Sequence, residues 1–215
     1  VSSTRLPKKV LMDVEGLPML FRQADRIRHF IPHTPLIIAT SKESSDDSIQ
    51  EMCDEKGIMC FRGSLDNVVL RFLECVQKFD LDYIIRVGGD DPLIDPECCK
   101  ALMDANIEEK HDFIYASNIE GWPYGSAAEL ISKKALELIN SKALNPLYKE
   151  HTIPYFFDHP EQFNIKKLKS PRGINRPNYY FTVDFPEDLE LIRSIFRILK
   201  SEGDYFPFKR VIELI

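Results

Sequence analysis

Acidic side chains follow directly after an apolar stretch near the middle of the chain. Residues 81–85 are largely apolar and predict a buried strand, after which the sequence reads RVGGDDPLIDP over residues 86–96. Two glycines allow the backbone to turn sharply there, and the carboxyl edge of a sheet is where open α/β folds bind their ligands. Carboxylates at this edge suit a divalent cation that phosphate oxygens also hold. The alternative is an Asp-rich turn that caps the next helix.

Two other segments carry side chains of the types that such a site needs. The loop SSTRLPKK at residues 2–9 combines hydroxyls, backbone N–H groups and three cations, which suits a polyphosphate. It lacks the GxxxxGK[ST] pattern of a P-loop, and a solvated basic segment is the alternative. Near the other end, TVDFPED at residues 182–188 places Asp184 at the end of a predicted strand. Asp90 and Asp184 could then share one or two magnesium ions.

Several polar and aromatic residues allow more than one interpretation. His151 lies in EHTIPY at residues 150–155, and a single histidine is more often a hydrogen-bonded structural residue than a catalyst. Tyr124 lies in a loop where an aromatic ring could stack on a sugar or a base, and simple packing is the alternative. Glu187 and Asp188 are explained by the dipole of a helix that begins beside them.

Strands and helices alternate along the first half of the chain and would bring these segments together. Strands are predicted at residues 35–40, 58–61, 81–87, 112–116, 129–131, 163–168 and 179–183. Helices are predicted at residues 18–30, 44–56, 66–79, 96–106, 133–140, 148–158, 186–200 and 206–214. Ser44 or Ser45 could cap the second helix, Gly57 would end it, and Pro154 would kink the sixth or mark a boundary in it. The pattern predicts an α/β fold with a mainly parallel central sheet and helices on both faces.

The bulk composition limits the class of protein. The 215 residues are 44% hydrophobic and 29% charged, which is ordinary for one globular domain spanning residues 1–215. The net charge of −6 and the lack of a basic block argue against binding to a nucleic-acid polymer. No apolar run is long enough to cross a bilayer, no signal peptide is seen, and five cysteines without a CxxC pair favour reduced thiols. A cytoplasmic protein that does not act at a membrane is therefore expected.

In their order and spacing, the segments resemble the nucleotide-sugar cytidylyltransferases, which activate Kdo and sialic acids with CTP. The similarity is greatest to the branch named after spore coat polysaccharide biosynthesis protein F, and it covers nearly the whole chain. It rests on the motifs STRLPxK (residues 3–9), GxPM (16–19), ATS (39–41), FRGSxDxVxxR (61–71), GDxPLIDP (89–96), EHxxPY (150–155) and TVDxPED (182–188).

The resemblance implies a Rossmann-like, GT-A-like nucleotidyltransferase fold, with CTP as substrate and Mg²⁺ as cofactor. A sugar oxygen would attack the α-phosphate and release pyrophosphate, making an activated sugar for a surface polysaccharide. As the catalytic set, Arg5 and Lys9 would hold the triphosphate, and Asp90 and Asp184 would hold the metal. The implied nucleotide-binding set is Ser3, Thr4, Ala39, Thr40, Ser41, Arg62, Gly63, Asp66, Arg71, Arg86 and Gly89. The acceptor set is Glu129, Glu150 and His151, with Tyr124 as a stacking ring.

Departures from the family pattern keep other functions open. The family's amino-terminal strand, which ends in Ala-Arg, is missing here, and Ser2 and Lys8 stand where glycines are usual. Side chains at those positions could obstruct phosphate binding, so a nucleotide-binding protein without turnover is one alternative. Transfer from another NTP to a sugar phosphate is a second, and a glycosyltransferase, which would need an Asp-x-Asp motif, is a third. By the resemblance, residues 118–168 would bind the acceptor and form a homodimer contact.

Overall fold

The structure, a computed structural model, describes residues 6–142 and 144–215. A four-stranded sheet in the order β5-β7-β6-β8 is formed by β5 (Tyr83–Arg86), β6 (Phe113–Tyr115), β7 (Glu129–Ser132) and β8 (Ile165–Lys167). β7 runs antiparallel to both of its neighbours, whereas β6 and β8 are parallel, so β5, β6 and β8 share one direction. The predicted α/β class is confirmed, and the reversed β7 makes the sheet a mixed one.

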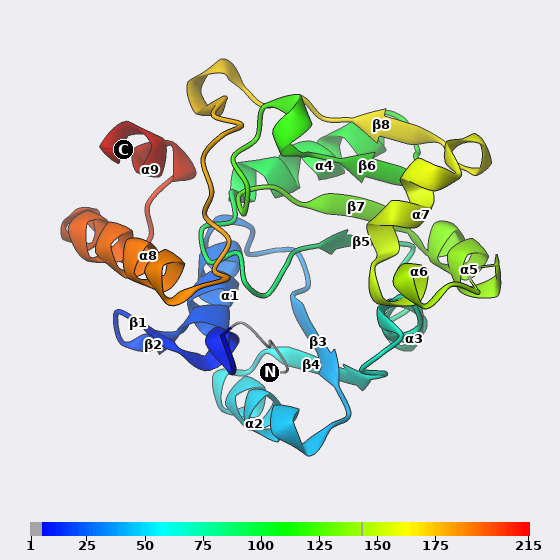
Figure 1. Cartoon of the computed structure of the whole chain (residues 1–215), viewed down its shortest axis with the longest axis horizontal. Helices are drawn as coiled ribbons and strands as arrows, with labels where there is room; N and C mark the ends of the chain where they lie inside the picture. Colours follow the sequence, from blue (N-terminus) through cyan, green and yellow to red (C-terminus); the bar gives the residue numbers. More distant parts are fainter. Residues whose placement is uncertain (1–5, 143) are drawn as a thin grey trace.

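A second pair of strands and a short hairpin lie next to this sheet (Figure 1). β3 (Ile37–Ser41) and β4 (Met59–Gly63) pair in parallel. The hairpin of β1 (Asp13–Val14) and β2 (Leu17–Pro18) turns at Gly16, whose φ is 91°. The sequence analysis did not predict this hairpin, because strands of two residues carry no periodicity.

Helices cover both faces of the four-stranded sheet, as predicted (Figure 1). The α-helices of residues 6–142 and 144–215 are α1 (Met19–Phe30), α2 (Asp47–Lys56), α3 (Val68–Lys78), α4 (Pro96–Glu108), α5 (Lys133–Lys142), α6 (Pro146–Glu150), α7 (Thr152–Asp158), α8 (Pro186–Leu199) and α9 (Phe208–Leu214), of which α2 packs beside β3 and β4 instead. One hydrophobic core joins Ile114 and Leu130 to α4, α8 and α9, and another joins Phe113 and Ile131 to α3, α5 and α7. Neighbouring residues of one strand therefore face opposite layers, as the strand period of two requires.

The strand predicted at residues 179–183 is instead an extended segment with one isolated bridge, between Tyr124 and Tyr180. Its N–H groups bond to loops and not to a neighbouring strand. Phe181 N donates to Tyr124 O at 2.8 Å, and Val183 N donates to Asp90 O at 2.9 Å. The prediction of a strand was wrong, because the residue types of this segment do not show what its backbone pairs with.

The helix predicted at residues 148–158 is divided between α6 and α7. The break lies at His151, which has an extended backbone with φ −117° and ψ 104°. Pro154 does not cause the break, since it falls in the first turn of α7, where the helix needs no backbone donor. The division leaves α7 as a separate short helix beside the sheet.

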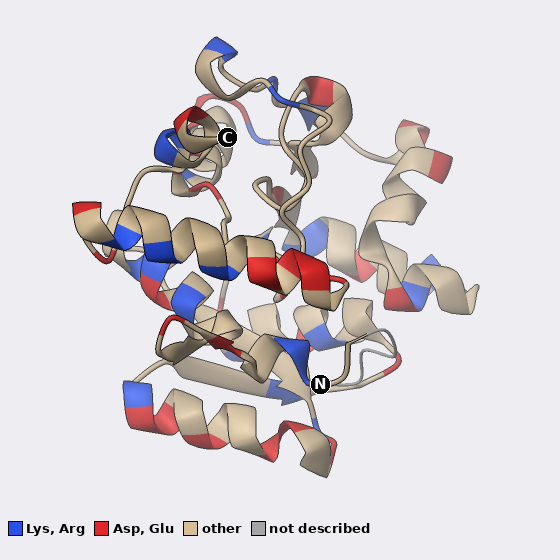
Figure 2. Cartoon of the chain, turned by 60° about the vertical axis from the view of Figure 1, so that its left-hand side comes forward, with Lys and Arg blue, Asp and Glu red and all other residues tan. Residues whose placement is uncertain are grey.

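Helix length and the distribution of charged side chains are relevant to binding of membranes and nucleic acids. Within residues 6–142 and 144–215, no helix is long and apolar enough to cross a membrane. Figure 2 shows Lys and Arg interspersed with Asp and Glu along the helices. The net charge of −6 is thus the small difference between many acidic and many basic side chains that lie close together on the helices.

Asp95 begins α4 from a buried position and makes the stability of the fold depend on pH. Its carboxylate accepts a hydrogen bond from Glu97 N at 3.0 Å, and the residue is 3% exposed. Burial raises the pKa of Asp95 to about 6, although the Glu97 hydrogen bond and the charge of Arg26 oppose the rise. The folded state therefore binds this proton more tightly than the unfolded state does. Stability is expected to fall as the pH rises from about 4 to about 6.

The variant Asp95→Asn keeps a capping side chain and removes the buried charge. We expect its free energy of unfolding to exceed that of the wild type by about 1–2 kcal/mol at pH 8, and by much less at pH 4. Urea unfolding at the two pH values measures the difference. A wild-type protein that gains stability over the variant as the pH rises would contradict the expectation.

Candidate active site

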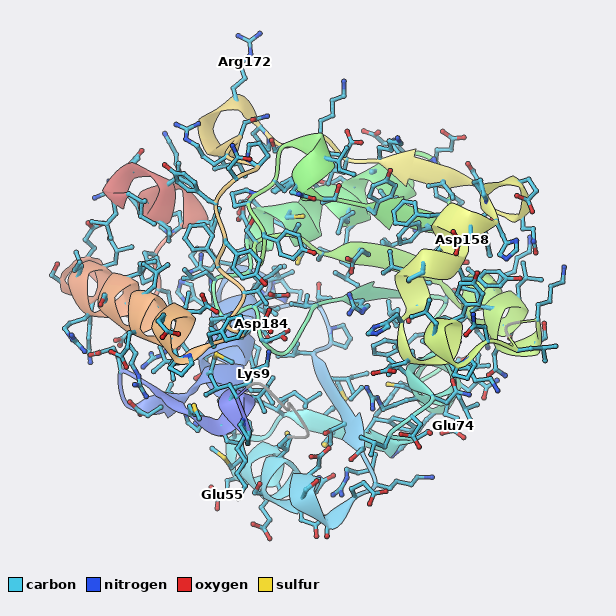
Figure 3. The ribbon with its side chains drawn as sticks, viewed as in Figure 1. Lys9, Glu55, Glu74, Asp158, Arg172 and Asp184 are labelled. Atoms are coloured by element: carbon cyan, nitrogen blue, oxygen red, sulfur yellow. The ribbon has the colours of Figure 1, made fainter. Side chains whose placement is uncertain are left out.

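Three residues of the predicted catalytic set meet at one point of the fold. Lys9 Nζ lies 2.8 Å from Asp90 Oδ2 and 3.1 Å from Asp184 Oδ1, and it donates to Val183 O at 2.7 Å. Figure 3 shows Lys9 and Asp184 next to each other near the centre of the molecule. Each of these two residues is 7% exposed, so water screens their charges only weakly. The structure brings the three side chains together, while their roles toward CTP and metal stay predictions.

The ammonium of Lys9 compensates the charge of the two carboxylates. Burial alone would lower the pKa of Lys9, but its hydrogen bonds to Asp90 and Asp184 and their charges outweigh burial and raise this pKa. Lys9 therefore stays protonated at neutral pH. The carboxylate pair is already arranged around one positive charge.

The turn after β5 is crowded at one of its two glycines. A Cβ at Gly88 would lie 2.5 Å from Asp91 Oδ2 and 2.8 Å from Asp90 Oδ1, so a side chain there would displace both carboxylates. At Gly89 a Cβ would meet no atom closer than 3.6 Å, which is an ordinary contact. Gln23 Nε2, on α1, donates to Gly88 O at 2.6 Å and to Asp91 O at 2.7 Å. Gln23 was not predicted, although a polar side chain on the buried side of the first helix was an available signal.

Asp184 is held by the segment before it and by the helix after it. Its Oδ2 accepts a hydrogen bond from Tyr180 Oη at 2.7 Å. Its backbone N–H donates to Asp188 Oδ2 at 2.9 Å, and Phe185 N donates to the same oxygen at 2.8 Å. Acidic residues make the start of α8 red in Figure 2, and Asp188 caps this helix in addition to facing its dipole.

The other aspartates of the turn have different surroundings. Asp91 Oδ1 accepts a hydrogen bond from Thr182 Oγ1 at 2.7 Å. Burial and the charge of Asp90 raise the pKa of Asp91 to about 7, although Thr182 and Arg86 act in the opposite direction. Asp95 caps α4, as the alternative interpretation of the Asp-rich turn predicted, whereas the binding of a cation by Asp90 stays a prediction.

A cleft of about 420 Å³ opens beside Asp90 and Asp91, between the end of β5, the residues after β6, the loop before β7, and α7. Its size suits a small molecule such as a sugar. Arg86 Nη1 and Glu129 Oε2 form an ion pair at 3.1 Å inside it, where β5 and β7 are paired. Burial raises the pKa of Glu129, and Arg86 opposes the rise. Tyr124, which was predicted to stack on the acceptor, also lines the cleft.

The predicted nucleotide residues of β3 gather around a carboxylate that the sequence analysis did not single out. Asp46 Oδ2 accepts hydrogen bonds from Thr40 Oγ1 at 2.6 Å, from Ser41 N at 3.0 Å and from Ser41 Oγ at 2.7 Å. Burial would raise the pKa of Asp46, but these hydrogen bonds outweigh it and hold the pKa well below its usual range. Within the described residues the predicted serine cap of α2 is not formed, and a 3₁₀ turn at Ser44–Asp46 precedes the helix instead.

Arg62 ties the end of β4 to the loop after β3. Its Nη2 donates to Glu43 O at 2.9 Å and pairs with Asp47 Oδ1 at 2.8 Å, and its Nε donates to Ser41 O. The predicted residues on these two parallel strands therefore lie together at the carboxyl ends, namely Ala39, Thr40, Ser41, Arg62 and Gly63. The polar contacts described for the side chains of Thr40, Ser41 and Arg62 are to residues 41–47, which form the end of β3 and the loop that leads into α2. Contact of these residues with a nucleotide stays a prediction.

Gly63 and Arg71 are also brought into contact. A Cβ at Gly63 would lie 2.5 Å from Arg71 Cγ, so glycine lets the α3 side chain pass close to β4. Arg71 Nη1 donates to Ser64 O at 2.9 Å, whereas its buried Nε has no hydrogen-bond partner among the described residues. Asp66 is exposed in the loop before α3.

The structure does not bring every predicted residue to the cleft. Glu150 and His151 are exposed at the junction of α6 and α7 and are not among the residues that line it. Instead, Ile153 and Phe157 of α7, which were not predicted as site residues, form part of its wall. The predicted residues Ser3, Thr4 and Arg5 lie outside the described residues.

Lys8 adopts the backbone conformation of a glycine. Its φ of 59° and ψ of 20° lie in the left-handed region, which costs a residue with a side chain about 1 kcal/mol. Glycine, which the resemblance led us to expect at this position, would adopt this φ without that cost. The Lys8 side chain is exposed and leaves Lys9 in contact with both carboxylates.

Comparisons with known proteins identify the family of this chain. A family model described as cytidylyltransferase matches residues 1–206. The chain belongs to the cytidylyltransferase family. As a cytidylyltransferase, it is a nucleotidyltransferase enzyme, and CTP is the substrate that this family implies.

Relatives of this cytidylyltransferase include proteins with narrower descriptions. Spore coat polysaccharide biosynthesis protein SpsF of Bacillus subtilis is 31% identical over 202 residues, which are 92% of this chain and 83% of SpsF. The 3-deoxy-manno-octulosonate cytidylyltransferase of Polynucleobacter asymbioticus is 34% identical over 113 residues, which are 50% of this chain and 42% of that protein. The predicted membership of the cytidylyltransferases is confirmed.

Solved structures support the same fold. A cytidylyltransferase from Leptospira borgpetersenii matches with a TM-score of 0.90 at 26% identity, over 99% of this chain and 89% of that one. The CMP:2-keto-3-deoxy-manno-octonic acid synthetase complexed with CTP matches with a TM-score of 0.68 at 18% identity, over 92% of this chain and 95% of that one. The second match shows a shared fold, and the predicted nucleotidyltransferase architecture is confirmed.

Proposed function

We propose that this cytidylyltransferase transfers CMP from CTP to a sugar in a Mg²⁺-dependent reaction that releases pyrophosphate. The observation that carries the proposal is the meeting of Lys9, Asp90 and Asp184 beside a cleft of about 420 Å³. Phosphoryl-type transfer needs positioning and charge neutralisation more than a covalent catalyst, and this cluster provides both. The names of SpsF and of the 3-deoxy-manno-octulosonate enzymes support an acidic sugar, or a sugar derivative, destined for a surface polysaccharide.

Asp90 and Asp184 fit Mg²⁺ by the chemistry of their donors. Both present carboxylate oxygens to one shared cation, which is the ammonium of Lys9. Among the described residues no cluster of three or more His, Cys, Asp or Glu side chains is found, and Mg²⁺ at phosphate sites commonly uses only one or two carboxylates. When bound, Mg²⁺ would neutralise negative charge on the phosphate oxygens and on the leaving pyrophosphate.

The protein's own residues would orient the two substrates. Lys9 donates its N–H groups to carboxylates here, and the same groups suit the oxygens of a triphosphate. Arg86 was predicted to bind the nucleotide, but it lies in the cleft, where its ion pair with Glu129 offers N–H donors and carboxylate acceptors to a sugar. The half-exposed ring of Tyr124 offers an apolar surface on which a sugar ring can stack.

Pyrophosphate release tests the proposal. The full-length protein is incubated with CTP, Mg²⁺ and a panel of acidic sugars, and pyrophosphate is measured with and without each sugar. We expect release that depends on both Mg²⁺ and one of the sugars. A full-length protein that releases no pyrophosphate from any nucleotide would refute the transfer reaction.

Thermal shift with the four NTPs separates the remaining candidates. A pocket built for cytosine should be stabilised most by CTP, since the stabilisation follows the ratio of ligand concentration to dissociation constant. A larger shift with another NTP would favour transfer from that nucleotide to a sugar phosphate. Tight CTP binding without turnover would favour a nucleotide-binding protein, a candidate that the side chain at Lys8 keeps open.

Residues 118–168 are proposed as the acceptor-binding region and as a homodimer contact of one cytoplasmic enzyme domain. Exposed large hydrophobic side chains of this region support the contact, since apolar surface suits association with a second copy. Leu144 and Leu147 are exposed in this way and do not line the cleft. Analytical ultracentrifugation measures the oligomeric state, and a monomer at micromolar concentration would contradict the proposed dimer.

A further inference from the structure

The segment of residues 179–184 is attached at both ends to parts of the proposed site. At one end, Tyr124 N donates to Tyr179 O at 2.9 Å, and Phe181 N donates to Tyr124 O at 2.8 Å. At the other end, Val183 N donates to Asp90 O at 2.9 Å. The segment therefore links the loop that lines the cleft to the turn that carries Asp90.

Glycine allows the first of these attachments. Gly125 has a φ of 81°, and a Cβ on it would lie 2.5 Å from Thr182 N. The two backbones thus contact each other directly, without a side chain between them. Such close packing fixes the distance between the segment and the loop, and it thereby fixes the position of the side chains that the segment carries.

Tyr180 connects the loop that lines the cleft to Asp184. Its ring stacks on Tyr124, with centroids 5.1 Å apart and an interplanar angle of 14°. Its hydroxyl donates to Asp184 Oδ2 at 2.7 Å, while Asp184 Oδ1 lies 3.1 Å from Lys9 Nζ. The stacked ring limits where the hydroxyl can lie, and the hydroxyl limits how the carboxylate can rotate.

We propose that Tyr180 is a positioning residue that orients Asp184, so that Oδ1 faces the cation position shared with Asp90. The stack on Tyr124 makes this orientation depend on the wall of the acceptor cleft. The inference rests on the proposed function, because it assumes that Asp184 holds the metal. Tyr180 is not itself required to touch CTP, the sugar or the metal. Its effect should therefore appear in metal affinity more than in the maximal rate.

The variant Tyr180→Phe keeps the stacked ring and removes only the hydroxyl. Mn²⁺ binding to the full-length protein with CTP, and without a sugar, is measured by the loss of the free Mn²⁺ signal in electron paramagnetic resonance. We expect the variant to bind Mn²⁺ about 10-fold more weakly than the wild type, which is the usual scale for a residue that orients a metal ligand. In turnover, the Mg²⁺ concentration for half-maximal rate should rise by a similar factor, and the rate at saturating Mg²⁺ should change little.

Tyr179→Phe is the matched control, because it removes a hydroxyl from the neighbouring tyrosine, whose ring packs against Phe181 with centroids 6.2 Å apart. It should bind Mn²⁺ as the wild type does. Tyr124→Ala removes the stacking partner and should weaken Mn²⁺ binding in the same direction as Tyr180→Phe. Loss of Mn²⁺ affinity in both of these variants, and not in the control, supports the inference.

Two results would overturn the inference. One is Tyr180→Phe with wild-type Mn²⁺ affinity, and the other is an equal loss in Tyr179→Phe, which would indicate a general structural effect. Failure of the proposed function is distinguishable, since Mn²⁺ binding is measured without transfer. A wild type that binds Mn²⁺ with CTP but releases no pyrophosphate would refute the transfer reaction. The role of Tyr180 would still be supported in that case if Tyr180→Phe binds Mn²⁺ more weakly than the wild type.

Discussion

Asp90→Asn or Asp184→Asn is expected to reduce Mg²⁺-dependent pyrophosphate release by at least about 100-fold, the scale on which loss of one charge-stabilising group slows a transfer reaction. Each substitution keeps the shape of the side chain and removes one of the two charges proposed to hold the metal. The fold should survive, because Lys9 Nζ retains Val183 O and the other carboxylate as acceptors. Pyrophosphate release and the thermal midpoint are measured on the same preparations.

Glu187→Gln is the control for these variants. It makes the same change of charge three residues after Asp184, at an exposed side chain in the first turn of α8. Its turnover should stay within about twofold of the wild type, since an exposed charge so placed contributes only weakly. Undiminished activity in Asp90→Asn or Asp184→Asn would remove that residue from the metal site.

The proximity of Asp90 and Asp184 could be predicted from local signals. Buried extended segments and glycines are visible in the sequence, and both aspartates follow such segments. Direction and pairing are not local properties. A strand was predicted at residues 129–131, but the antiparallel pairing of β7 with β5 and β6 depends on the path of the loop before it. For the same reason, the segment before Asp184 was predicted as a strand, although it bonds to loops.

The residues that the sequence analysis missed have partners that are distant or indirect. Gln23 contacts the Asp-rich turn across 65 and 68 positions of sequence, and nothing near it in the chain indicates that turn. Asp46 lies at the start of a helix, where an acidic residue is explained by the helix dipole, so its bonds to Thr40 and Ser41 carried no separate signal. Tyr180 appeared as one more aromatic residue of a strand. Only the folded chain shows that its hydroxyl meets Asp184.

Lys9→Met is expected to reduce both turnover and stability, because it removes the charge that the two carboxylates share. We expect the free energy of unfolding to fall by about 2 kcal/mol at pH 7, less than for a fully buried pair, since the Asp90 side chain is 33% exposed. Pyrophosphate release should fall by about 100-fold, since the ammonium is proposed to bind the triphosphate. Urea unfolding and the pyrophosphate assay measure the two losses.

The effect of Mg²⁺ on the thermal midpoint, measured without nucleotide, is a second test of the Lys9→Met prediction. In the wild type, a metal ion must displace the ammonium from Asp90 and Asp184, whereas in Lys9→Met the two carboxylates face each other without it. Mg²⁺ should therefore raise the thermal midpoint of the variant more than that of the wild type, because stabilisation follows the affinity of the folded state for the ion. Lys8→Met, at an exposed neighbouring lysine with φ 59°, should respond to Mg²⁺ as the wild type does. Equal shifts in Lys9→Met and the wild type would show that the ammonium and the metal do not share one position.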